Sequence, residues 1–482
     1  MEGTKKIMVR SAEYQKPPTG TPTVADEAGK ALFFVLERAI VGVAHVVWWA
    51  VLFPMLSLPL AGAGALWWWR GWSYGVGAVA FSGAMWMVWW AWWPGSWRRW
   101  VSGRVRGRYL SWKRYKVSWN TTLALNGLTA MLDNGVLTPR LVSISIGDTA
   151  DILKIKMLKS QTVDDWADRA DALRNAFGAI GVRVRTIESG WVRLEVIQVD
   201  RLTEPIPLPR VEPDTVDLEA LAIGLTELGE LWRIRLLGNQ LLVAGATGSG
   251  KGSVVWATIA ALGPAIRAGV VQVWVLDPKG GMEFGAARRW FARFAYDNGP
   301  GALKLLQDAA AMVQGRGESY MDSWARKITP SVKEPLIFLI IDEAASVSAY
   351  FSDRKIRDEI LRLLGDVLSK SRAVAVPVMG CLQDPSKEVI PLRQLFPTRL
   401  GLRMKERTQP DMALGDKARD RGALCDQIPM SMPGVGYVEY DESPEITRVR
   451  AYHVTDDDIR WIMTTYPPPH CQGKNDLGKD AG

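Results

Sequence analysis

The chain has little of what would bind a metal ion or build a disulfide framework. Its 482 residues include only three cysteines and three histidines. They are widely spread, which excludes a disulfide-stapled domain and a dense Cys/His metal site. Charged residues make up 23% and hydrophobic residues 48% of the chain. These are ordinary globular values, so the whole chain is neither disordered nor a coiled coil, and its length leaves room for two or three domains.

Charge is missing from two long stretches near the N-terminus. Residues 39–69 and 71–97 contain no Asp, Glu, Lys or Arg, and only Arg70 separates them. Each stretch exceeds the roughly 20 apolar residues that a membrane span needs, and 13 of the 23 tryptophans lie between Trp48 and Trp100. We therefore expect a transmembrane hairpin within residues 31–97, with helices near 39–60 and 72–93 and a turn at the small residues 61–64. The alternative is a buried hairpin of a soluble domain, although uncharged runs of this length are rare there.

Acidic residues are missing from residues 98–116, which hold six Arg and two Lys. These eight charges equal the net charge of the whole chain, +8. Residues 1–30, a polar leader expected to be disordered, are also rich in lysine. The positive-inside rule therefore predicts a multi-pass protein of the bacterial cell membrane with both termini in the cytoplasm. Residues 98–116 would form a basic juxtamembrane segment against anionic headgroups.

The remainder divides into two α/β parts and a tail. Residues 117–212 show alternating strand patterns around one helical pattern, which predicts a small α/β domain that ends in a proline-rich linker. Residues 213–460 contain several fully apolar strands of the parallel-sheet type, so we expect a larger, doubly wound α/β domain there. Residues 461–482 are expected to form a flexible polar tail.

A phosphate-binding glycine loop is predicted in the larger domain. An apolar strand at 241–244 is followed by the pattern G-x-x-x-x-G-K and then by a helical pattern, in the order that a P-loop requires. Glycines let backbone N–H groups approach phosphate oxygens, and the helix N-terminus favours negative charge. Lys251 would contact the β- and γ-phosphates. The expected nucleotide-binding residues are Gly245, Ala246, Thr247, Gly248, Ser249, Gly250, Lys251, Gly252 and Ser253.

A carboxylate pair follows a second apolar strand about 90 residues later. Asp342 and Glu343 come directly after the run LIFLII. In P-loop enzymes such a pair holds Mg²⁺ and orients the attacking water, which are the roles we expect for Asp342 and Glu343 respectively. Asp277 and Gln383 also follow apolar strands, and sites in such sheets lie at the carboxyl ends of the strands. We expect Asp277 to contact the nucleotide and Gln383 to sense the γ-phosphate.

One position departs from the P-loop pattern. The residue after the loop lysine is normally Ser or Thr, whose hydroxyl binds Mg²⁺, but here it is Gly252. Either Ser253 reaches the metal ion through a shifted helix start, or water replaces the hydroxyl. ATP and Mg²⁺ are therefore the expected cofactors, with Ser253 and Asp342 as the candidate metal ligands.

Five blocks in this order resemble the FtsK/SpoIIIE family of double-stranded DNA translocases. They are LLVAGATGSGKGS (241–253), VWVLDPKGGMEFG (273–285), LIFLIIDEAA (336–345), SKSRAVAVPVMGCLQDPSKEVIP (369–391) and FPTRLGLRM (396–404). The resemblance covers about residues 220–440, and DPKGG is its most discriminating element. The loop ending in GKGS is similar to those of actinobacterial TraB-type conjugation proteins.

The resemblance implies a RecA-like motor that assembles as a homohexamer around duplex DNA and moves it during conjugative transfer of a plasmid or integrative element. It also implies an arginine finger from the neighbouring subunit, for which Arg399 and Arg407 are the candidates. Members that read a DNA address carry a further winged-helix domain. The stretch after Val438 is too short for one, so a separate addressing or channel protein is the expected partner.

Three alternative functions remain open on the sequence. A chromosome segregation motor at division would normally have more membrane helices, a long linker and the address-reading domain. A type VII-like protein secretion ATPase would normally have several motor domains, whereas this chain has one glycine loop. A nucleotide-gated membrane scaffold would follow if Gly252 made the metal site defective.

Overall fold

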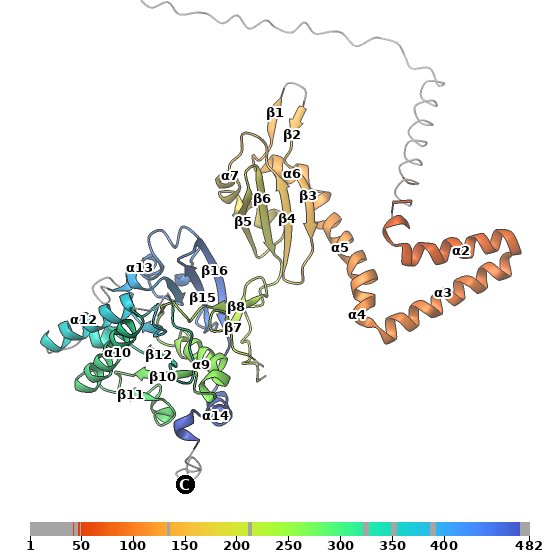
Figure 1. Cartoon of the computed structure of the whole chain (residues 1–482). Helices are drawn as coiled ribbons and strands as arrows, with labels where there is room; N and C mark the ends of the chain where they lie inside the picture. The colour runs from red at the N-terminus through yellow and green to blue at the C-terminus, as the bar shows by residue number, and fades with distance from the viewer. Residues whose placement is uncertain are drawn as a thin grey trace, which may run out of the picture. The chain divides into compact units, whose positions relative to one another are not determined.

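The computed structural model describes residues 42, 47–48, 50–132, 135–210, 215–321, 327–348, 354–385 and 392–472 (Figure 1). The chain separates into two compact units, residues 1–117 and 118–482, which are taken in turn below. The expected leader, most of the first expected span before residue 50, and residues 473–482 of the expected tail lie outside the described residues.

Unit 1 contains a helical hairpin whose turn lies later than the sequence predicts. Helix α2 runs over Pro54–Arg70 and α3 over Trp72–Trp92. Pro54 starts α2 rather than ending a preceding helix, as suits a residue without an N–H at the first helical position. The small residues 61–64 continue the helix, because alanine favours helices and isolated glycines are tolerated in them. The chain reverses at Gly71, whose φ of +101° favours glycine.

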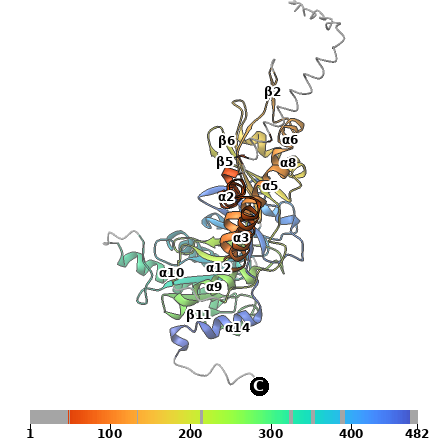
Figure 2. The ribbon, with the colours of Figure 1, turned by 90° about the vertical axis from the view of Figure 1, so that its right-hand side faces the viewer.

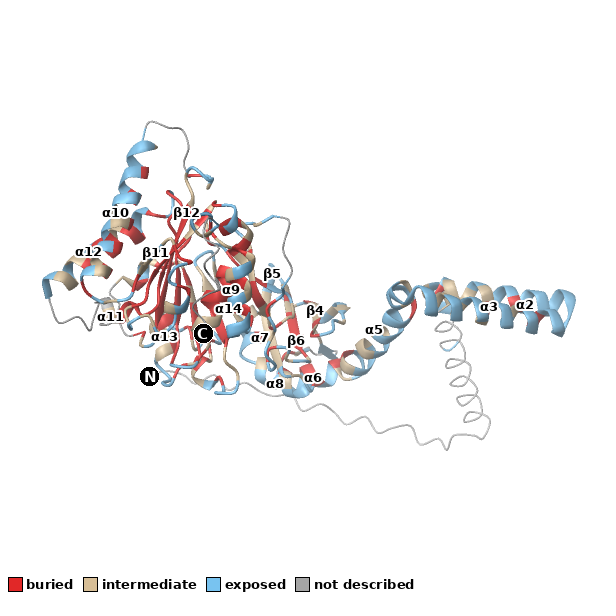
Figure 3. Cartoon of the chain, turned by 90° about the horizontal axis from the view of Figure 1, so that it is seen from below, coloured by how far each residue is buried: buried red, intermediate tan, exposed pale blue. Residues whose placement is uncertain are grey.

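The hairpin exposes much of its apolar surface. Figure 3 shows α2 and α3 as mostly exposed, and Trp68 is 91% exposed. Within the described residues, no helix meets the length and hydropathy expected of a membrane-spanning helix. The expected transmembrane hairpin therefore stays a prediction.

The basic segment is helical throughout. After α4 (Pro94–Trp97), it comprises a π-helical turn at Arg98–Ser102, α5 (Gly103–Ser111) and a second π-helical turn at Trp112–Lys116. The guanidinium of Arg104 lies 4.4 Å from the ring centroid of Trp100, a cation–π distance. Basic and aromatic side chains thus alternate along one continuous helical stretch.

Unit 2 begins with a small α/β domain. After α6 (Trp119–Leu125) and the hairpin β1 (Ala130–Leu132)–β2 (Gly135–Leu137), four antiparallel strands pair in the order β3-β4-β6-β5. Alternate residues of the central strands, such as Leu153, Ile155 and Leu194, are fully buried. The expected single helix is two short ones. The bounds are β3 Arg140–Ser145, β4 Ala150–Lys156, α7 Val163–Ala167, α8 Ala170–Ala176, β5 Gly181–Glu188 and β6 Trp191–Ile197.

The larger domain is built on a ten-stranded mixed sheet in the order β11-β10-β12-β13-β9-β14-β15-β16-β7-β8. The pairs from β11 to β14 are parallel, and those from β14 to β8 are antiparallel. The fold class is therefore α/β. The bounds are β7 Leu221–Thr226, β8 Leu231–Ile234, β9 Leu241–Ala244, β10 Val271–Leu276, β11 Arg293–Ala295, β12 Leu336–Ile341, β13 Val378–Leu382, β14 Thr398–Leu402, β15 Val435–Tyr440 and β16 Ser443–Ala451.

Helices cover both faces of this sheet. One core packs α9 (Lys251–Arg267) and α14 (Asp456–Thr465) against one set of strand residues, and Figure 2 shows these two helices close together. The other core packs α10 (Pro300–Ser319) and α12 (Arg354–Lys370) on the opposite face. The short helices α11 (Ala344–Ser348) and α13 (Gln409–Leu414) follow β12 and β14. Burial on both faces explains why β12, LIFLII, is apolar at every position.

Candidate nucleotide site

The glycine loop lies between β9 and α9, at the carboxyl end of a central strand. Gly245 and Ala246 donate backbone hydrogen bonds to the carbonyls of Leu382 and Arg403, which fix the loop between the two neighbouring strands. Gly250 caps α9 with a φ of +99°. A Cβ there would also overlap the backbone of Gly434, so only glycine suits this position.

Lys251 is folded back into the loop. Its Nζ donates to the carbonyl of Gly245 at 2.7 Å and to that of Ala246 at 3.3 Å. Burial lowers the pKa of Lys251, while the charges of Glu343 and Asp342 oppose this shift. The ammonium therefore lies inside the loop that would surround a phosphate, and its hydrogen-bond partners among the described residues are these two neutral carbonyl oxygens.

Asp342 and Glu343 lie beside this loop because β12 is two strands from β9, with β13 between them. Both carboxylates are nearly buried, at 7% and 4% exposure. Burial raises the pKa of Asp342 to about 6; Lys279 opposes the shift, and nearby carboxylates add to it. The backbone N–H of Gln383 donates to Oε1 of Glu343 at 3.3 Å.

Lys279, a residue that our sequence analysis did not single out, links the two carboxylates. Its Nζ lies 3.2 Å from Oε2 of Glu343 and 3.7 Å from Oδ2 of Asp342. Burial alone would lower the pKa of Lys279, but these carboxylates raise it overall. The sequence did offer a signal for Lys279, because this lysine stands in the DPKGG block, the most discriminating element of the resemblance.

Asp277 organises the loop that carries Lys279. Its carboxylate accepts backbone hydrogen bonds from Lys279, Glu283 and Phe284, at 3.3, 3.2 and 3.2 Å. The side chain is completely buried. The structure thus shows Asp277 holding the loop of Lys279, and its expected contact with the nucleotide stays a prediction.

Thr247 at the tip of the glycine loop gathers two further polar side chains. Its hydroxyl donates to Oε1 of Gln383 at 3.2 Å, which places Gln383 between the loop and Glu343. Nη2 of Arg403 donates to the Thr247 carbonyl at 2.8 Å. Arg403 was also missed by the sequence analysis, because arginines near the end of an apolar strand are common.

The expected shift of the helix start is absent. Helix α9 begins at Lys251, and the hydroxyl of Ser253 accepts a long hydrogen bond of 3.5 Å from the N–H of Val454. Ser253 is thereby turned toward the segment before α14. The expectation that it reaches the metal ion gains no support from this geometry.

The two arginine-finger candidates differ in their hydrogen bonds and in their exposure. Arg399 in β14 is half-buried and donates to the carbonyls of Phe396 and Leu414, at 3.0 and 3.4 Å. Arg407 lies exposed in the turn between β14 and α13. Arg399 is thus held by contacts within its own chain, whereas Arg407 is exposed, and the arginine finger itself stays a prediction.

The residues present suit Mg²⁺ bound together with a nucleotide. This ion typically takes one or two carboxylates and completes its octahedron with phosphate oxygens and water. Asp342 offers such a carboxylate beside the glycine loop. Among the residues that the structure describes, no three His, Cys, Asp or Glu side chains are grouped to hold a metal ion by themselves.

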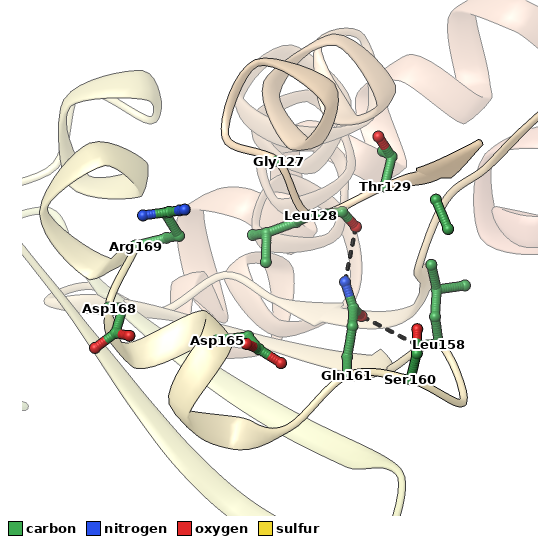
Figure 4. A pocket seen from close by; sticks show the side chains of 10 residues that line it. Gly127, Leu128, Thr129, Leu158, Ser160, Gln161, Asp165, Asp168 and Arg169 are labelled. Carbon is green, nitrogen blue, oxygen red and sulfur yellow. Dashed lines mark hydrogen bonds between the residues drawn. The ribbon is translucent and has the colours of Figure 1, made fainter. Parts of the chain in front are cut away.

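A separate hollow in the small domain uses its polar groups for the fold. In Figure 4, Gln161 bridges two backbone segments: its amide donates to the Leu128 carbonyl at 2.9 Å and accepts from the Leu158 N–H at 3.1 Å. Thr162 caps α7, and Asp165 completes the capping box by accepting from the Thr162 backbone N–H. The hollow therefore shows no catalytic arrangement.

The sheet and the site together have the arrangement of a P-loop nucleotide-binding protein. The glycine loop, the loop lysine and the carboxylate pair converge at the carboxyl ends of parallel strands, as this class requires.

Two sequence comparisons match this chain to conjugal transfer proteins. Residues 100–198 match the family model described as the Actinomycete conjugal transfer protein N-terminal domain. The transfer protein TraSA of Streptomyces ambofaciens is 28% identical over 343 residues, which cover 66% of this chain and 79% of that protein. The resemblance to actinobacterial conjugal transfer proteins is thereby confirmed.

Solved structures show more distant likeness. The pCW3 conjugation coupling protein TcpA, with ATPγS, is 18% identical, with a TM-score of 0.47 over 72% of this chain and 98% of that one. The cytoplasmic domain of the type VII secretion ATPase EccC of Thermomonospora curvata is 20% identical, with a TM-score of 0.40 over 54% and 31% of the two chains.

Proposed function

We propose that this protein is an ATP-driven motor that moves double-stranded DNA during conjugative transfer. The observation that carries the proposal is the meeting of Lys251, Lys279 and the Asp342–Glu343 pair at one end of the sheet, in a chain similar to a conjugal transfer protein. The cluster of side chains supports ATP hydrolysis, and the similarity to a conjugal transfer protein supports DNA transfer as the process that uses the energy.

The side chains divide the hydrolysis between them. Lys251 exchanges its carbonyl partners for the β- and γ-phosphate oxygens, which are stronger acceptors for an ammonium group. Glu343 orients the attacking water and accepts its proton. Gln383 lies between Thr247 and Glu343, so it can report the γ-phosphate to both. Bound Mg²⁺, held by Asp342, would neutralise phosphate charge.

The active assembly in this proposal is a homohexamer. Arg407 of one subunit completes the site of the next and stabilises the charge on the transferred phosphoryl group. Its exposure, compared with the internally bonded Arg399, supports this choice. Duplex DNA is held mainly through its phosphates, so binding tolerates sequence and weakens with salt. Addressing and the channel then fall to separate proteins.

Attachment to the bacterial cell membrane is part of the proposal, with both termini and the motor in the cytoplasm. The exposed tryptophans of α2 and α3 and the eight basic residues of 98–116 support it. Exposed apolar surface of this extent needs a partner, and a lipid surface suits aromatic and basic side chains together.

The test is ATP hydrolysis by the purified full-length protein with and without duplex DNA. We expect duplexes of unrelated sequence to raise kcat, and Lys251→Ala and Glu343→Gln each to abolish the stimulated rate. Arg372→Ala, at an exposed position outside the site, serves as the control. A rate that no DNA changes would contradict the proposed cargo, whereas a rate that survives Glu343→Gln would contradict the assigned chemistry.

A further inference from the structure

The space next to Gly252 is occupied by a carboxylate. A Cβ built on Gly252 would overlap Oε1 of Glu283. Because α9 begins at Lys251, Gly252 stands in its first turn, where P-loop enzymes carry the Ser or Thr that binds Mg²⁺. The carboxylate oxygen therefore approaches the helix where the missing hydroxyl-bearing side chain would begin.

Glu283 is held at this place by its backbone. The N–H groups of Glu283 and Phe284 both donate to Oδ2 of the buried Asp277, at 3.2 Å. The ring of Phe284 is fully buried against Trp256 and Phe291, at centroid distances of 5.7 and 6.2 Å. The main chain at Glu283 is thus anchored from behind, while its own side chain stays exposed on the side of the site.

The carboxylates around Glu283 create negative charge that a bound cation would offset. Glu283 lies close enough to Asp342 for the two carboxylates to repel each other, and Asp277 and Glu343 add negative charge. Lys279 contacts Asp342 and Glu343, and Lys251 is turned into the glycine loop. A divalent ion between phosphate oxygens and carboxylates would relieve this repulsion.

We propose that Glu283 supplies, directly or through a bound water, the metal-facing oxygen that a Ser or Thr after the loop lysine would otherwise supply, and that Gly252 provides the space for it. A Gly252–Glu283 pair thus replaces the usual hydroxyl. The assignment rests on the proposed function, because it needs a nucleotide and its metal ion in the site.

The experiment measures the affinity of the full-length protein for a fluorescent, slowly hydrolysed ATP analogue, once with Mg²⁺ and once with EDTA. The ratio of the two dissociation constants reports metal binding without relying on activity. We expect Glu283→Gln to reduce this ratio by about 10–100-fold, the range for losing a group that positions a bound metal, and to leave the affinity in EDTA unchanged. The matched control, Glu188→Gln on the small domain, should behave as wild type.

A second variant restores the usual arrangement. In Gly252→Ser combined with Glu283→Ala, the serine hydroxyl stands at the standard position, and the side chain that would overlap the serine Cβ is removed. We expect it to recover the Mg²⁺ advantage to within about threefold of wild type, since a hydroxyl is the common ligand there. An unchanged ratio in Glu283→Gln, or no recovery in the double variant, would overturn the assignment. Failure of the wild-type protein to bind the analogue would overturn the proposed function itself, and this assignment with it.

Discussion

At the scale of single residues, the site is defined by how Lys279 holds the carboxylate pair. A like-charged pair buried beside the glycine loop would repel without a cation between them. The ammonium of Lys279 lies within ion-pair distance of both carboxylates, nearer to Glu343. We regard Lys279 as a positioning residue, since it acts through Glu343 rather than on the nucleotide.

Replacing Lys279 with methionine tests this role. Methionine keeps the length of the side chain but removes the charge, so Glu343 loses the contact that orients it. We expect kcat to fall about 10–100-fold, a part of the 10²–10⁴ that a positioned general base contributes, with little change in KM. Lys304→Met, which breaks a surface ion pair with Asp308, is the matched control. An equal fall in kcat in the two variants would contradict a positioning role for Lys279.

The raised pKa of Asp342 predicts a pH-dependent stability. Its folded-state pKa is about 6 against an ordinary value of 3.8, chiefly because of burial. A raised carboxyl pKa stabilises the folded state below pH 3.8, and this contribution is lost as pH rises to about 6. Asp342→Asn should therefore raise the melting temperature of the nucleotide-free protein by about 2–4 °C near pH 8, and by about half as much near pH 5, where only the unfolded-state carboxyl is mostly ionised. Asp441→Asn, at an exposed position, should show neither effect.

The sequence was sufficient to predict the residues that define the P-loop class, but not those that adjust the site. Gly245–Lys251 and Asp342–Glu343 are contiguous motifs after apolar strands, so their proximity follows from the order of the parallel strands. The DPKGG block marks Lys279, but its contacts with Asp342 and Glu343 join distant segments, as do the approach of Glu283 to Gly252 and the bond of Arg403 to Thr247, and no local pattern predicts these contacts. The orientation of Ser253 depends on Val454, some 200 residues away.

At the scale of elements, the composition of the helical hairpin predicts two apolar helices but not the position of the turn between them. Missing charge marks α2 and α3 correctly as apolar, but it does not place the turn. That place depends on which residue can take a positive φ, and Gly71 does so where residues 61–64 do not. The strands β9 and β12 fall at the expected positions, because burial on both faces leaves a continuous apolar run.

The exposed hairpin predicts how the protein leaves a membrane preparation. If the tryptophans of α2 and α3 hold the protein in lipid, high salt and alkaline carbonate should both fail to release it, and detergent should succeed. Attachment through residues 98–116 alone would weaken with salt, because surface charge is screened within about 10 Å at 0.1 M. Fractionation of cells expressing the full-length chain, followed by immunoblotting, distinguishes these results. Release by salt would contradict a role for the hairpin.

At the scale of the whole molecule, the net positive charge is not evidence for DNA binding by the larger domain. A value of +8 is typical of a nucleic-acid-binding protein, yet the eight charges lie in the helical segment 98–116. The proposal of DNA as the cargo rests instead on the five sequence blocks that resemble the FtsK/SpoIIIE family and on the likeness to TraSA. The larger α/β domain holds the candidate nucleotide site, and the small domain contributes most of the segment that matches the conjugal transfer family model.

The measurement that tests the central claim most directly is displacement of a third DNA strand from a duplex. A motor that tracks along double-stranded DNA strips off a bound triplex strand, whereas an ATPase that only binds DNA does not. The full-length wild-type protein should release the strand with ATP and Mg²⁺, while Glu343→Gln should bind the same DNA and leave the triplex intact. DNA-stimulated ATP hydrolysis by the wild-type protein with the third strand still in place would contradict the account.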